Sequence, residues 1–314
     1  MARLDAARLA AQRRRNWLVS MAVLAAIVGW MVLIAWLVLG EQAALWAVMV
    51  SPIVLAFPPV RSTAVLKALY GAVPLGPATA PGLLRLVREL AGRADLARIP
   101  PLLYIPRPEV VALSTGWGRE ATLAVSDGLL RLLPPRELAA VLAHEVAHLQ
   151  AGDLKILRLA DAAGRLTRLL SMVGLLLVAM TLPTATLAGL PIPWLAILLL
   201  MLAPVGSDLM ALALSRTREF AADAGAAGLT GDPAALIHAL ERIDTVQSGG
   251  WERLVRLPGW RWVSWIRTHP TTGERVTRLS ALAPEPERHW ILLPHAILPP
   301  DFPPLGLNRW GWRR

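Results

Sequence analysis

Two histidines and a glutamate fall within five residues in the stretch HEVAH, residues 144–148. On an α-helix, His144 and His148 lie one turn apart on the same face, and Glu145 projects beside them. Two imidazoles placed in this way can bind one Zn²⁺, which lowers the pKa of a bound water to about 7 and leaves Glu145 to accept its proton as general base. The pattern therefore predicts a zinc site with hydrolytic chemistry.

The alternative is a solvated helix face on which the histidines coincide by chance. A chain with this content of His and Glu contains about 0.004 such patterns by chance. The residues around the histidines are nearly all apolar, so a solvated face does not fit. A buried His–Glu–His group needs partners, and a metal ion supplies one. The chain has no cysteine, which excludes disulfides and thiolate ligands and leaves only histidines and carboxylates.

A catalytic zinc ion usually has three protein ligands and one open position. Glu219 and Asp223 lie four residues apart in the stretch SRTREFAADAGAAGLT, residues 215–230. Glu219 is a candidate third ligand, and Asp223 is placed to accept the free ring N–H of a ligand histidine. A Glu–Asp pair at this spacing is also typical of a solvated helix face, so the spacing alone leaves ligation open.

The helices and strands that must position these residues are short, and prolines and glycines mark their ends. Pro134 and Pro135 predict the start of the helix that carries HEVAH, and Gly152 predicts its end. Residues 81–96 have the pattern of an amphipathic helix. Three short apolar runs, broken by proline or glycine, are interpreted as strands: 101–106, 110–115 and 121–126.

The composition places these elements in a membrane protein. The chain has 314 residues, 55% of them hydrophobic, and a mean hydropathy of +0.50, which is too high for a soluble domain. A cleaved signal peptide is the alternative for the first apolar run, but that run is too long for one. Four stretches are predicted to cross the bilayer as two hairpins: 17–39, 43–60, about 169–190 and 192–214.

The basic residues predict the orientation of these spans. The formal net charge of +10 fits nucleic acid or an anionic membrane surface, and the apolar spans favour the membrane, with no nucleic-acid partner. Dense basic clusters, such as Arg13 to Arg15, fall on one side of the paired spans, and the turns within each pair carry few charges. The positive-inside rule then predicts a multi-pass protein of the plasma (inner) membrane, with both termini and the active site cytoplasmic.

The chain is accordingly divided into alternating membrane and polar blocks. The Trp-rich stretch 251–267 is basic and aromatic, which fits contact with a membrane interface, and a core-packed helix and loop fit almost as well. The expected blocks are a basic N-terminus with a transmembrane hairpin (1–60), the first part of a cytoplasmic catalytic domain (61–168), a second transmembrane hairpin (169–214), the second part of the catalytic domain (215–283) and a Pro- and Trp-rich tail (284–314).

Three motifs taken together resemble the membrane-integrated zinc metalloproteases that include HtpX and the CAAX prenyl proteases. They are HEVAH followed by Asp153, SRTREFAADAGAA at 215–227, and THPTTGERVTRL at 268–279. The resemblance spans about residues 80–282. Four spans, two before the catalytic segment and two after HEVAH, look like HtpX, whereas the CAAX proteases have more spans.

The resemblance implies a fold and a set of site residues. The implied fold is an α-helical integral membrane protein with about four transmembrane helices and a mainly α, zincin-like (α+β) metalloprotease domain carrying a small β-sheet. Glu219 is implied as the third zinc ligand and Asp223 as its support. The stretch HPTTGER matches a His-Pro-x₄-Arg element, so His269 or Arg275 is expected to steady the site or the developing oxyanion. A structural role for His269 in capping a turn is the alternative.

One departure from the family concerns substrate binding. The family commonly carries an Asn-Ala-Phe-Ala-x-Gly-like strand near the substrate cleft, and VALSTG, residues 111–116, stands in its place. Val111 replaces the usual Asn and Leu113 the usual Phe. An edge strand of this kind can still bind an extended peptide through main-chain hydrogen bonds with little demand on sequence.

The function implied by the resemblance is that of an HtpX-type zinc endopeptidase. It would cleave misfolded or damaged membrane proteins at the cytoplasmic face, as part of quality control and the stress response. One alternative is a CAAX-type protease acting on prenylated peptides. Another is a non-catalytic, zinc-binding membrane scaffold, in which Glu145 would have no use. The oligomeric state is left open.

Overall fold

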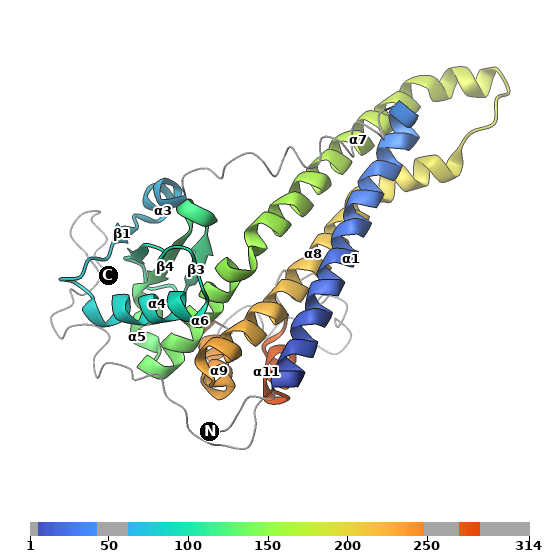
Figure 1. Cartoon of the computed structure of the whole chain (residues 1–314). Helices are drawn as coiled ribbons and strands as arrows, with labels where there is room; N and C mark the ends of the chain where they lie inside the picture. The colour runs from blue at the N-terminus through green and yellow to red at the C-terminus, as the bar shows by residue number, and fades with distance from the viewer. Residues whose placement is uncertain (1–5, 43–61, 248–269, 283–314) are drawn as a thin grey trace.

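The computed structural model describes residues 6–42, 62–247 and 270–282. Three long helices lie side by side and project from a compact part, which holds a small sheet and the shorter helices (Figure 1). The candidate ligands lie where the long helices enter the compact part.

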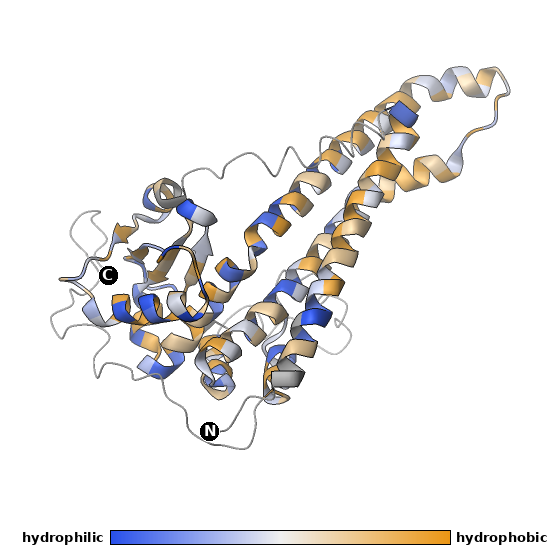
Figure 2. Cartoon of the chain, in the orientation of Figure 1, coloured by the Kyte–Doolittle hydropathy of each residue, from blue (hydrophilic) through white to orange (hydrophobic). Residues whose placement is uncertain are grey.

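The long helices are α1 (Ala6–Leu39), α7 (Asp153–Leu187) and α8 (Trp194–Thr230). In the described part of the chain, these three are long and apolar enough to cross a membrane. Apolar residues follow their outer parts, whereas the polar residues gather toward the compact part (Figure 2). The predicted span 17–39 lies inside α1, and the predicted span 43–60 lies outside the described residues.

Helices α7 and α8 hold most of the last two predicted spans and extend well beyond them on the side of the compact part. Each helix continues into the compact part, because the Ala-rich and amphipathic stretches next to the spans are themselves strong helix formers. The boundaries predicted at 168 and 214 therefore fall inside continuous helices. Helix α7 ends at Leu187, before the predicted 190, where Gly189 has a φ of +68° and prolines follow.

Small residues and one proline fit the long helices together. Pro204 cannot donate a backbone hydrogen bond to the carbonyl of Leu200, and the hydroxyl of Ser171 on α7 donates to that carbonyl instead. Trp30 of α1 lies against Gly206, and its Nε1 donates to the carbonyl of Ala203 at 3.0 Å. All three helices are therefore joined beside Pro204.

The compact part contains a four-stranded mixed sheet in the order β1-β2-β4-β3. Strand β2 runs parallel to β4, and β3 runs antiparallel to β4 at the edge of the sheet. The three predicted strands are confirmed within one or two residues, and the two-residue β1 was not predicted. The strands are β1 (Val73–Pro74), β2 (Leu102–Ile105), β3 (Ala112–Thr115) and β4 (Thr122–Ser126).

Most of the shorter helices pack with this sheet around one hydrophobic core, whereas Leu66 belongs to a separate cluster with Leu103 and Ala124. The helix that carries HEVAH, α6, has Pro134 as its N-cap and Pro135 at its first position, and Gly152 caps its end with a φ of +65°, as the sequence predicts. The others are α3 (Ser62–Tyr70), α4 (Pro81–Arg93), α5 (Asp127–Leu132), α6 itself (Pro135–Ala151), α9 (Pro233–Gln247) and α11 (Thr272–Ser280), with a 3₁₀ turn at Gly118–Glu120.

Candidate metal centre

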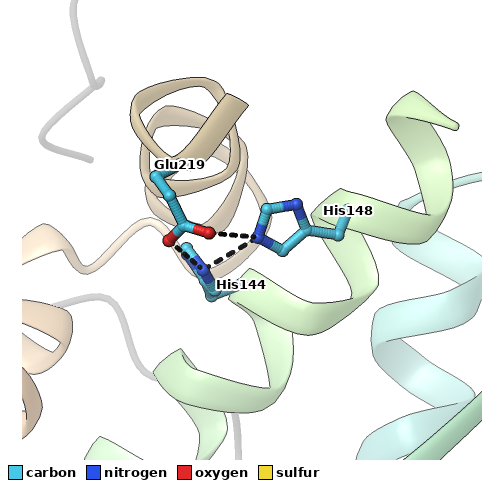
Figure 3. A group of neighbouring side chains, drawn as sticks. All are labelled: His144, His148 and Glu219. Carbon is cyan, nitrogen blue, oxygen red and sulfur yellow. Dashed lines mark hydrogen bonds and ion pairs between the residues drawn. The ribbon is translucent and has the colours of Figure 1, made fainter. Parts of the chain in front are cut away.

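Three candidate ligands converge where α6 packs against α8. His144 and His148 project from one face of α6, and the carboxylate of Glu219 on α8 faces both rings (Figure 3). The two Nε2 atoms are 3.1 Å apart, and the Glu219 oxygens lie 3.5 Å from His144 Nε2 and 3.6 Å from His148 Nε2. Ligand atoms around a tetrahedral zinc ion lie about 3.4 Å apart, so the spacing fits one ion.

The other nitrogen of each ring is held by a carboxylate. His144 Nδ1 lies 3.0 Å from Asp223 Oδ1, and His148 Nδ1 lies 2.6 Å from Asp153 Oδ2. A carboxylate accepts the Nδ1 proton and so turns the Nε2 lone pair of each neutral ring toward Glu219. Two lone pairs and a carboxylate directed at one point repel one another unless a cation lies between them. The donor set therefore fits a metal ion.

The carboxylates around His144 favour a positive charge at this ring. Burial opposes protonation of His144, but hydrogen bonds to Asp223 and Glu219 outweigh it and raise the pKa of His144 to about 10. Burial would raise the pKa of Asp223, but the nearby Arg275 and His144 lower it. Asp223 is thus a carboxylate at neutral pH, and a metal ion at His144 Nε2 would take the place of a proton.

Helix α11 brings Arg275 to the same site. Its guanidinium donates to Asp223 through Nε at 2.8 Å and Nη2 at 2.5 Å, and Nη1 lies 3.9 Å from Glu219 Oε2. Thr271 and Glu274 form a capping box at the start of α11, and Arg216 of α8 binds Glu274 with two hydrogen bonds. Arg275 therefore lies beside the candidate ligands, whereas the predicted site residue His269 lies outside the described residues.

Glu145 lines a cleft that also contains the three candidate ligands. The cleft has a volume of about 490 Å³ and is bordered on one side by the edge strand β3, including Leu113. Helix α9 forms an apolar wall of the cleft through Leu236, Leu240 and Ile243, which were not predicted to belong to the site. The structure thus places a general-base candidate, a candidate metal site and the edge strand of the sheet around one cavity.

The convergence of α6 and α8 depends on a close approach at Gly225. A Cβ atom built on Gly225 would lie 2.7 Å from the Cβ of Ala147, the residue before His148. Any side chain at this position must push the two helices apart, and Glu219 and Asp223 lie on the same helix as Gly225.

We expect Gly225→Ala to lower both the stability of the protein and its affinity for a metal ion, with zinc as the test ion. Overpacking of this kind costs about 1–3 kcal/mol, which would appear as a lower melting temperature in detergent and weaker zinc binding in a chelator competition. The matched control is Gly92→Ala in α4, where nothing lies within 4 Å and alanine favours the helix. Equal melting temperatures for the two variants would contradict the close approach.

Two residues of the site were not assigned from the sequence. Asp153 was noted only as part of a motif, and the structure places it on His148. Arg218 was counted only as part of the basic cluster that follows a span, yet its side chain is buried and bound to Asp153. The available signal was the position of Arg218 directly before Glu219, on a stretch otherwise rich in alanine.

The sequence of this chain matches known proteases. Residues 77–283 match the model of peptidase family M48. The chain belongs to peptidase family M48. It is 32% identical to a protease HtpX homolog from Ralstonia nicotianae over 85% of this chain and 97% of that protein. It is 39% identical to a protease HtpX homolog from Acidiphilium cryptum over 69% of this chain and 79% of that protein.

A solved structure is also similar. The crystal structure of S. mikatae Ste24p aligns with a TM-score of 0.48 and 19% identity, over 84% of this chain and 66% of that one. The M48 match includes all three candidate ligands and Glu145. The family match and the HtpX relatives identify this chain as a membrane metalloprotease, as its sequence predicts. Its described part has three candidate membrane helices and a possible His–His–Glu metal site.

Proposed function

We propose that this protein is a membrane-embedded zinc endopeptidase of the HtpX type, which hydrolyses misfolded or damaged membrane proteins at the cytoplasmic face. The observation that carries the proposal is the convergence of two imidazole Nε2 atoms and a carboxylate within 4.8 Å of one another, in the cleft that Glu145 lines. His144, His148 and Glu219 would hold the ion. Three protein ligands leave a fourth position open to water and substrate, which is typical of catalytic zinc.

Residues of the chain itself would carry out the proton transfers and hold the ligands in place. Zinc, when bound, supplies a Lewis acid that polarises the scissile carbonyl and acidifies water. Glu145 accepts the proton of the attacking water and delivers it to the leaving amine. Asp223 keeps the Nδ1 proton on His144, so the ring offers Nε2 to the metal. Arg275 donates two hydrogen bonds to Asp223 and fixes its position. Its positive charge would also favour the negative charge that develops on the scissile carbonyl oxygen of a bound substrate.

The edge strand and the apolar wall suggest how a substrate is bound. Strand β3 pairs with β4 on one side, and on its other side it borders the cleft. An extended peptide added at this edge would run past Glu145. Main-chain hydrogen bonds would hold it, and these depend little on the sequence of the peptide. The apolar wall of α9 fits the apolar side chains that a misfolded membrane protein exposes.

The charge pattern supports a cytoplasmic site in the plasma (inner) membrane. The compact part lies at the end of α7 and α8 that carries the basic residues, and the loop between them, residues 188–193, carries none. Basic segments remain cytoplasmic under the positive-inside rule. The partners that follow are the lipid bilayer and unfolded membrane proteins cut in their cytoplasmic segments.

We expect metal removal to abolish proteolysis and zinc to restore it. Dialysis of the detergent-purified protein against a chelator should lower the cleavage of an unfolded membrane polypeptide to background, since both water activation and carbonyl polarisation are lost. Addition of about one equivalent of zinc should recover the rate. A folded copy of the same substrate serves as the control, and equal cleavage of both would contradict a role in quality control.

A prenylated peptide separates this proposal from the CAAX-type alternative. If the protein cleaves that peptide and does not cleave the unfolded polypeptide, the result would favour the CAAX hypothesis. Zinc binding with no cleavage of either substrate would favour a scaffold.

A further inference from the structure

Arg218 lies beside the candidate metal centre without pointing into it. It directly precedes Glu219 on α8, and only 6% of its side chain is exposed despite its charge. Its Nε donates to Asp153 Oδ1 at 2.5 Å, and its Nη2 contacts the same oxygen. The other oxygen of Asp153 lies 2.6 Å from His148 Nδ1. Asp153 is thus shared between Arg218 and a candidate metal ligand.

The far side of Arg218 reaches the first long helix. Its Nη1 donates to Ser20 Oγ of α1 at 3.3 Å. Ser20 is completely buried, and its hydroxyl donates in turn to the carbonyl of Asn16 at 2.8 Å. A continuous series of hydrogen bonds therefore runs from α1, through α8 and the first residue of α7, to His148 on α6.

This use of an arginine differs from membrane anchoring. A basic residue at the end of a membrane span usually extends its charge to the headgroups. Arg218 instead turns inward, where an incompletely paired guanidinium would be costly. Because its bonds to Asp153 and Ser20 fix the direction of the guanidinium, they also fix the carboxylate that orients His148.

We propose that Arg218 is a positioning residue which, held by Ser20 of α1, sets the orientation of Asp153 and His148, so that zinc affinity depends on the docking of the first membrane helix. The proposal rests on the zinc site proposed above. It assigns to α1 a role in the metal centre in addition to membrane insertion. Residues that support metal-bound histidines typically change metal affinity about 10- to 100-fold when replaced.

Zinc affinity of the full chain in detergent tests this role without relying on proteolysis. A chelator competition would compare the wild type with Arg218→Gln, Arg218→Lys and Ser20→Ala. We expect Arg218→Gln to bind zinc about 10- to 100-fold more weakly and Arg218→Lys to recover part of that loss. Ser20→Ala, which removes one hydrogen bond, should weaken binding about fivefold. Leu18→Ala is the control, since Leu18 is 54% exposed on the same helix.

Two further readouts separate positioning from general destabilisation. The melting temperature of the metal-free protein should fall in Ser20→Ala by no more than the loss of one hydrogen bond explains. The visible spectrum of the cobalt-substituted protein should change as the His148 ring turns. Wild-type zinc affinity in Arg218→Gln would overturn the proposal, as would wild-type affinity in Ser20→Ala if Arg218→Gln does not fold. A wild-type protein that binds no zinc would instead overturn the proposed function.

Discussion

Replacement of Glu145 by glutamine is expected to reduce peptide hydrolysis about 10²- to 10⁴-fold while the protein still binds about one zinc ion per chain. The amide has nearly the shape of the carboxylate but cannot accept the proton of the attacking water. Glu145 lines the cleft beside His144 and His148 without belonging to the candidate ligand set. The measurement is kcat/KM on an unfolded polypeptide, with zinc content determined on the same sample.

The matched control is Glu89→Gln, because Glu89 is an exposed glutamate of α4 whose ion pair with Arg93 lies on the surface. Its kcat/KM should remain near that of the wild type. A Glu145→Gln protein with wild-type activity would show that another group activates the water.

Replacement of Glu219 by glutamine is expected to weaken zinc binding at least about 100-fold and to abolish activity at limiting zinc. The substitution removes the only anionic member of the three candidate ligands. It also leaves Arg275, whose Nη1 lies 3.9 Å from Glu219 Oε2, next to an uncharged group. A zinc titration against a chelator, with the rate measured at each point, tests both effects.

Asp208→Asn is the control on the same helix. Asp208 lies three turns before Glu219 on α8. It is largely exposed and forms an ion pair with Arg168. Its loss should leave zinc affinity unchanged. Should Glu219→Gln bind zinc as tightly as the wild type, a different group must complete the metal site.

Local sequence signals sufficed for the helix that carries HEVAH. Its start at Pro134 and Pro135 and its end at Gly152 depend on backbone rules that act within a few residues. The same holds for the strands, which are bounded by prolines and glycines. The site residues that a motif contains could also be named, because the family motif carries their spacing.

Features that depend on packing between distant segments could not be predicted in this way. The apolar wall of α9 faces the cleft only because α9 packs on α6, and an apolar helix face has the same pattern wherever it packs. The inward direction of Arg218 depends on Asp153, 65 residues away. The continuity of α8 was missed because hydropathy falls where the membrane ends, although the helix itself does not end there.

Because α8 is continuous, a change in the tilt of its membrane part also moves the residues that it carries at the metal site. Glu219 lies 15 residues beyond Pro204 on the same helix, or about 22 Å at 1.5 Å per residue. A tilt of about 3° at Pro204 therefore displaces the Glu219 carboxylate by about 1 Å. This displacement is several times the deviation that a metal–ligand distance tolerates. Membrane helices adjust their tilt to bilayer thickness by larger angles than this. The measured metal affinity of this protein should therefore change with the thickness of the lipid bilayer and with the choice of detergent.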